Sequence, residues 1–74
     1  MPRYYFHLIS QHRTIPDHDG VEVTDLAEAY AVAREAVEEF RRETPTRTLE
    51  GWRLEATDAS GGVVFSISLK EFLH

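Results

Sequence analysis

The chain has 74 residues, of which 42% are hydrophobic and 28% are charged, and it contains no cysteine. This composition predicts one globular domain and excludes a disulfide scaffold, a thiol nucleophile and a zinc–thiolate site. The formal net charge is −5, and the 8 basic residues are spread along the chain, so the surface would repel a phosphate backbone and we expect no nucleic-acid partner.

No segment of the sequence suits export or a membrane span. The start, MPRYYFHL, lacks the apolar run of a signal peptide. No stretch approaches the ~20 apolar residues that a spanning helix needs. A small domain without disulfides fits a reducing compartment. We therefore expect a cytoplasmic protein with no membrane partner.

Residues 3–10, RYYFHLIS, are predicted to form the first strand, because aromatic and branched side chains favour a pleated sheet. Successive side chains alternate between two faces, with Tyr4, Phe6 and Leu8 on one and Tyr5, His7 and Ile9 on the other. Both faces are apolar or amphipathic, so something must cover or contact the second face. The next segment contains the dense turn sequence Pro16-Asp17-His18-Asp19-Gly20, and the short extended pieces at 13–15 and 20–23 are candidates for a further strand.

Residues 26–43 carry the clearest pattern, which is that of an amphipathic helix. Asp25 is the predicted N-cap, and Glu28 three residues later completes a capping box. Pro45 ends the helix because proline disfavours helical geometry at the preceding residue. The apolar stripe follows helical spacing and consists of Leu26, Ala29, Tyr30, Ala33, Val37 and Phe40.

The opposite face of this helix is rich in glutamate and is predicted to be solvated, although its acidity would also suit a basic partner. Glu38 and Arg42 are predicted to form an ion pair at the i, i+4 spacing.

Two alternating segments, 52–57 and 63–69, predict a β-hairpin around the turn sequence DASGG at 58–62. Together the elements predict a single α+β domain over residues 1–74. One amphipathic helix would pack on one face of a three- to four-stranded antiparallel or mixed sheet, in the order β-(β)-α-β-β. The predicted core consists of Tyr4, Phe6, Leu8, Val23, Leu26, Tyr30, Ala33, Val37, Phe40, Trp52, Leu54, Phe65 and Ile67.

One helix covers one face of such a sheet, so the second face is the predicted contact surface. Its candidate binding residues are Tyr5, His7, Ile9, Arg53, Glu55, Ser66 and Ser68. One interpretation is a solvated sheet, since single exposed apolar residues are common and a tyrosine hydroxyl tolerates water. The other is a surface that binds a protein partner or a second copy of the chain, which would also relieve the small core.

Motifs for catalysis, cofactors and metals do not emerge from the sequence. The potential ligands near the start are His7, His12, Asp17, His18 and Asp19, but no HxH, HExxH or spaced histidine pair on one helix is present. A calcium loop aligned on Gly20 would need oxygen donors at Ile15 and Leu26. We predict no metal, no cofactor and no catalytic residue. The only pair that suggests acid–base chemistry is His7 beside Glu55 on neighbouring strands.

Three segments resemble an uncharacterised family of short bacterial proteins that are abundant in rhizobia-type soil bacteria. They are the start MPRYYFHL, the sequence DGVE followed by Asp25-Leu26 and the Ala/Glu-rich helix, and the sequence GWRLE with its Asp58…Gly61 turn. The resemblance covers nearly the whole chain and implies a complete single domain. The family has no assigned activity, so the resemblance transfers no catalytic residue.

The sequence Asp25-Leu26-Ala27-Glu28-Ala29 is also similar to the head of the helix in small antitoxin domains of the HicB type, although the strand arrangement differs. The leading hypothesis is a non-enzymatic protein-interaction or regulatory module that self-associates through its exposed sheet face. The alternatives are a small ligand-binding or enzymatic domain that uses His7, and an antitoxin-like partner of another protein.

Overall fold

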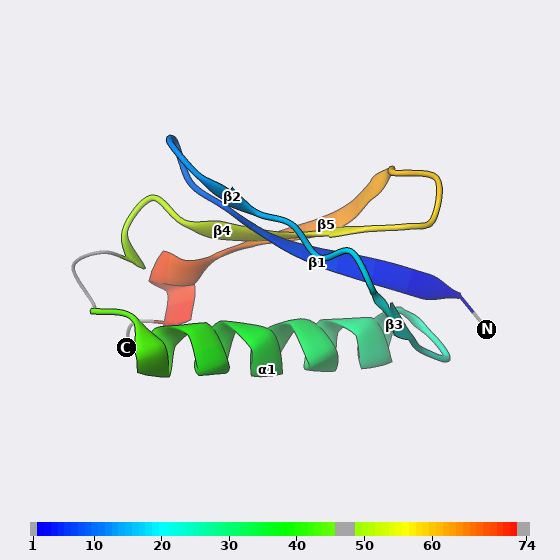
Figure 1. The fold of residues 1–74 in the computed structure, drawn as a ribbon. Helices are drawn as coiled ribbons and strands as arrows, with labels where there is room; N and C mark the ends of the chain where they lie inside the picture. Colours follow the sequence, from blue (N-terminus) through cyan, green and yellow to red (C-terminus); the bar gives the residue numbers. More distant parts are fainter. Residues whose placement is uncertain (1, 46–48, 73–74) are drawn as a thin grey trace.

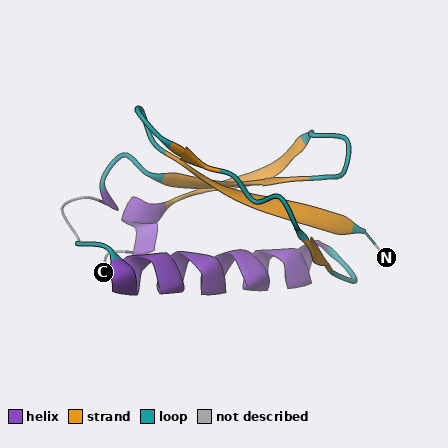
Figure 2. Cartoon of the chain, in the orientation of Figure 1, coloured by secondary structure: helices purple, strands orange, loops and turns teal. Residues whose placement is uncertain are grey.

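One helix lies against one face of a five-stranded antiparallel sheet (Figures 1 and 2). The computed structural model describes residues 2–45 and 49–72. Its elements are β1 (Arg3–Ile9), β2 (Thr14–Ile15), β3 (Val21–Glu22), α1 (Leu26–Glu43), β4 (Arg53–Thr57), β5 (Val63–Ser68) and the short 3₁₀ helix η1 (Leu69–Phe72). The predicted α+β fold with a single helix is confirmed. The sheet has five strands because the segment between β1 and α1 forms two short strands, one on either side of the turn at 16–20.

The sheet is built around the long pairing of β1 with β4. The strand order is β2-β1-β4-β5, and β3 also pairs with β1. Phe6 lies opposite Ala56, and Leu8 lies opposite Leu54. Both short strands share one edge of β1, with β2 beside its C-terminal end and β3 beside its N-terminal end. The other edge of the sheet is β5, which pairs only with β4 among the described strands.

The helix begins and ends where the sequence predicts. The Asp25 carboxylate accepts a hydrogen bond from the Glu28 N–H at 2.8 Å. Glu28 completes the cap by accepting from the N–H and the hydroxyl of Thr24, both at 3.1 Å. Thr44 is extended, with φ −128° and ψ 133°, as expected for the residue before Pro45.

The predicted ion pair between Glu38 and Arg42 is wrong, because the prediction names the wrong arginine. Glu38 pairs instead with Arg41, one residue closer in sequence, at 2.8 Å. This i, i+3 geometry is equally accessible on a helix surface. Hydrogen bonding by Arg41 and the attraction of the neighbouring cations lower the pKa of Glu38.

The core lies between α1 and the central strands. Its buried apolar residues are Phe6, Val23, Ala29, Ala33, Val37, Leu49, Trp52, Leu54, Ala56, Ile67 and Leu69. Phe40 contacts Trp52 at one end of the core, with the rings tilted and their centroids 5.2 Å apart. Leu49, which the sequence pattern missed, is fully buried ahead of β4. Among the described residues, no helix combines the length and apolar character that a membrane crossing requires.

Two residues predicted to belong to the core are exposed, and four others, Tyr4, Leu8, Phe40 and Phe65, are only partly buried. Leu26 is 51% exposed and Tyr30 is 44% exposed. Both lie on the side of α1 that points toward β5, because the Tyr30 ring contacts Phe65 edge-on at 5.6 Å and Leu26 precedes Tyr30 by one helical turn. The helix packs beneath β1 and β4. The part of its apolar stripe that turns toward β5 therefore has little of the sheet above it.

Replacing the helix cap tests how the fold is anchored. The substitution Asp25→Ala removes the acceptor for the Glu28 N–H, so we expect the free energy of unfolding to fall by about 1 kcal/mol. The control Glu39→Ala removes an exposed side chain from the C-terminal half of the same helix and is expected to change stability by less than about 0.5 kcal/mol. Urea titration followed by circular dichroism compares the two variants, and equal losses would contradict the capping role.

Candidate functional site

The predicted binding residues lie on the sheet face that points away from α1. On each strand they alternate with buried residues such as Phe6, Leu54 and Ile67, which face the helix. Across the strands, Ile9 lies opposite Arg53 and His7 lies opposite Glu55. The register continues with Arg53 opposite Ser68 and Glu55 opposite Ser66. We call this surface the open face and define it by Tyr5, His7, Ile9, Arg53, Glu55, Thr57, Ser66 and Ser68.

His7 is engaged at both ring nitrogens. Its Nδ1 accepts a hydrogen bond from the Asp17 N–H at 3.1 Å. Its Nε2 lies 3.1 Å from the Thr57 hydroxyl oxygen. An imidazole that accepts at Nδ1 carries its proton on Nε2 when neutral, so His7 donates to Thr57. Thr57 is only 9% exposed and His7 is half-buried, so this hydrogen bond is partly shielded from water.

Glu55 does not use His7 as its partner, although the two residues lie opposite each other on β4 and β1. The Glu55 carboxylate contacts the Arg53 guanidinium, with both Nε and one terminal nitrogen at 3.1 Å. The side chains of Arg53 and Glu55 are 47% and 23% exposed. The open face therefore presents one cation and one anion, side by side on an internal strand.

Asp17 organises the strand edge beside His7. One carboxylate oxygen accepts from the Phe6 N–H at 3.1 Å, in the gap between the pairings of β2 and β3 with β1. The other oxygen accepts from the N–H groups of Asp19 and Gly20 at 3.2 and 3.1 Å. Burial raises the pKa of Asp17, but the hydrogen bonds from Gly20, Phe6 and Asp19 outweigh it and the pKa falls below its usual value. The sequence marked Asp17 as a turn residue and a potential metal ligand, but not as an acceptor for the Phe6 N–H.

The turn at 16–20 packs against the β1 side of the open face. Gly20 has φ +71°, and a Cβ at this position would approach the Tyr5 ring to 2.8 Å and the Tyr4 carbonyl oxygen to 2.9 Å. Only glycine fits such a close backbone approach without strain. Tyr5 and His7 are consequently half-buried, and the exposed part of the open face lies over β4 and β5, at Arg53, Ser66 and Ser68.

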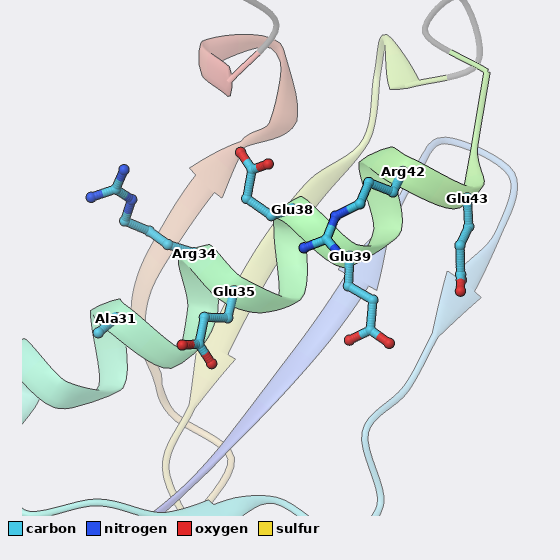
Figure 3. Close-up of a pocket in the computed structure, with 7 residues that line it drawn as sticks. All are labelled: Ala31, Arg34, Glu35, Glu38, Glu39, Arg42 and Glu43. Carbon is cyan, nitrogen blue, oxygen red and sulfur yellow. The ribbon is translucent and has the colours of Figure 1, made fainter.

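Two surface hollows formed by the described residues lie away from the open face. One is formed on the outer side of α1, where glutamate and arginine side chains spread from a single convex helix (Figure 3). Its lining residues are Ala31, Arg34, Glu35, Glu38, Glu39, Arg42 and Glu43. A second, smaller hollow includes His12 and Trp52. Within residues 2–45 and 49–72, no three His, Cys, Asp or Glu side chains are grouped to hold a metal ion.

Replacing Asp17 by asparagine tests the edge network. An amide keeps one acceptor oxygen but presents an NH₂ group toward a backbone N–H, so at least one hydrogen bond is lost and stability falls by about 1–2 kcal/mol near neutral pH. The pKa of Asp17 is lower in the folded chain than in the unfolded chain. Its stabilisation is therefore present above the unfolded pKa and is lost as the pH falls through the folded pKa.

Urea midpoints between neutral and strongly acidic pH measure this difference. The gap between the parent chain and Asp17→Asn is expected to shrink as the pH falls. Hydrogen bonds from the Ser60 hydroxyl and the Gly62 N–H also lower the pKa of Asp58. Asp58 is present in both proteins, so its effect on stability cancels when the two are compared. Asp19→Asn is the matched control, since the exposed Asp19 side chain holds none of these bonds. A gap that stays constant with pH would contradict the role of the Asp17 carboxylate.

Comparison with known proteins places the chain in a family. No curated protein and no solved structure matches it. A family model for a domain of unknown function, DUF6894, matches residues 3–70. The resemblance to an uncharacterised family is confirmed, while the soil-bacterial source that it implied stays a prediction. Because the match extends over all five strands and the helix α1, the chain belongs to the DUF6894 family.

Proposed function

We propose that this chain is a non-enzymatic protein-interaction module of the cytoplasm, and that it self-associates through its open face. The observation that carries the proposal is the one-sided cover of the sheet. The helix packs on one face, whereas Arg53, Ser66 and Ser68 are exposed on the other. A small domain whose sheet is covered on one side gains buried area most simply by pairing with an identical surface.

The charge pattern of the open face favours a second copy as the partner. Arg53 and Glu55 stand two residues apart on β4, an internal strand of the sheet. A twofold axis that passes at Leu54 and runs perpendicular to β4 brings Arg53 of one copy toward Glu55 of the other, so the pattern is complementary to itself. The surrounding hydroxyl groups of Ser66 and Ser68 offer both hydrogen-bond donors and acceptors.

The geometry gives less support to the alternative in which His7 binds a ligand or performs catalysis. Both ring nitrogens of His7 are already hydrogen-bonded within the chain. A general acid or base must reach the proton of a substrate, which His7 does only after it breaks one of these bonds. The antitoxin-like alternative stays a prediction.

Charge reversal on the open face tests the proposal. We expect Arg53→Glu to weaken self-association about tenfold or more, because like charges then meet across the contact. The double variant Arg53→Glu/Glu55→Arg restores the complementary pattern and is expected to recover the association. Arg42→Glu makes the same charge change on the outer side of α1 and serves as the matched control. Sedimentation equilibrium from micromolar to near-millimolar concentration gives the association constants.

Two results would contradict the proposed function. One is a parent chain that stays monomeric over the whole concentration range. The other is an equal effect of Arg53→Glu and Arg42→Glu, which would show that net charge rather than the open face controls association.

A further inference from the structure

The outer edge of β5 has no partner strand among the described residues. β5 stands last in the strand order, and its sequence, Val63–Ser68, contains neither a charged residue nor a proline. Sheet edges that stay single are usually protected by lysine, proline, a bulge or a very short strand. The register irregularity between β4 and β5 lies at Ala56/Thr57, near the start of β5, which leaves the stretch 65–68 regular. The regular stretch carries none of these protections.

The opposite edge of the sheet is protected in several ways. β2 and β3 contain two residues each, and Pro16 follows β2 directly. Between them, the Asp17 carboxylate occupies the N–H of Phe6. A long strand cannot add to this edge without displacing these groups. The two edges of the same sheet therefore differ sharply in their capacity to pair.

An exposed apolar strip accompanies the open edge of β5 on the helix side. It consists of Leu26 and Tyr30 from α1 and the partly buried Phe65 from β5. Leu26 and Tyr30 occupy core positions of the helical stripe, yet they are 51% and 44% exposed because α1 lies beneath β1 and β4. Leu26 and Tyr30 are thus apolar helix residues that the sheet of the same chain does not cover.

We propose that the edge of β5 pairs antiparallel with β5 of a second copy, joining the two sheets into one. This contact uses the backbone edge of β5 rather than the side chains of the open face, so it does not depend on open-face pairing. A second copy is the fitting occupant because antiparallel pairing makes one strand complementary to itself. In addition, β5 itself contains no charged residue, so two chains of net charge −5 bring no like charges together on the paired strands.

The pleat restricts the register of this pairing. Residues that face each other across antiparallel strands project to the same side of the sheet, so each helix-side residue must meet a helix-side residue. With Ser66 opposite Ser66 of the second copy, Phe65 lies opposite Ile67 of the second copy on the helix side. This register uses the regular part of β5 and keeps both helices on one face of the joined sheet.

The apolar strip then fills the space between the two helices. Each α1 lies beneath β1 and β4, about two strand spacings from the twofold axis, so the helix axes would be about 19 Å apart. Directly packed helices are about 8–10 Å apart, which leaves room for side chains. Leu26, Tyr30 and Phe65 of each copy point into this room. A stable interface needs ~800 Å² per partner, roughly a sixth of the 5013 Å² surface, so the strand edge requires the strip beside it.

Cysteine cross-linking tests the register, since the natural chain contains no cysteine. In the proposed register the two Ser66 Cα atoms lie about 4.5–5.5 Å apart, within the reach of a disulfide. We expect Ser66→Cys to form a covalent dimer on mild oxidation at least tenfold faster than Ser68→Cys, whose cysteines would be about 14 Å apart. Ala31→Cys, on the outer side of α1, reports cross-linking by random collision.

A second measurement locates the contact without a new cysteine. Tyr30→Glu places a charge in the apolar strip and is expected to weaken dimerisation at least tenfold, while Ala31→Glu adds the same charge to the neighbouring residue on the outer surface and leaves it unchanged. Both variants are first checked for a parent-like circular dichroism spectrum. In the parent chain, amide hydrogen exchange of β5 is expected to slow as the concentration rises, and exchange of β2 and β3 is expected to stay constant.

The outcomes separate this inference from the proposed function. Equal cross-linking of the Ser66 and Ala31 cysteine variants, or β5 exchange that does not depend on concentration, overturns the edge pairing. If Arg53→Glu nevertheless weakens association, the open face alone joins the copies. If Tyr30→Glu weakens association and Arg53→Glu does not, the edge contact holds and the open-face contact fails.

Discussion

The width of one α-helix governs the rest of this structure. A helix with its side chains is about 10–12 Å across, whereas strands in a sheet are about 4.8 Å apart. One helix therefore covers about two strands, and α1 lies beneath β1 and β4. These two strands contribute the fully buried Leu54 and Ala56 and the nearly buried Phe6. Outside this central pair the cover is uneven, since Ile67 of β5 is still buried whereas Ser66, Ser68 and the side of α1 at Tyr30 are exposed.

The edge of β1 shows how the chain completes its hydrogen bonding without a third long strand. Two short strands pair with its ends, and the Asp17 carboxylate accepts from the N–H between them. The same turn supplies the Asp17 N–H to His7, and His7 in turn reaches Thr57 on the next strand. A polar network thus runs from the edge turn across β1 to β4, and it holds the open face in place on that side.

Local patterns predicted the elements that local chemistry determines. Asp25, Glu28 and Pro45 defined both ends of the helix, and the alternation in 52–57 and 63–69 assigned the two faces of the hairpin. The predicted members of the open face do lie together, because alternate side chains of a pleated strand point to the same face of the sheet. Whether these residues bind a partner is a separate question from their placement.

Contacts between residues that are distant in the sequence could not be predicted from sequence patterns. The bond from Phe6 to Asp17 joins residues 11 apart through a turn whose path no periodicity encodes. His7 was expected to meet Glu55, which lies directly opposite, but it reaches the diagonal neighbour Thr57 because Arg53 holds the carboxylate. Helical spacing placed Tyr30 in the core but carried no information on how far α1 sits to one side of the sheet.

The two edges of the sheet differ in their ability to pair with a further strand, and this difference limits how many copies can join by strand pairing. A sheet with two receptive edges can add copies head to tail without end, which is the route to fibres. Here the edge at β1 is divided and its Phe6 N–H is occupied, so an incoming strand finds no continuous ladder to extend. Growth of the sheet by strand pairing at β5 therefore stops after one addition, because the edge of β1, where Asp17 holds the Phe6 N–H, cannot take a further strand.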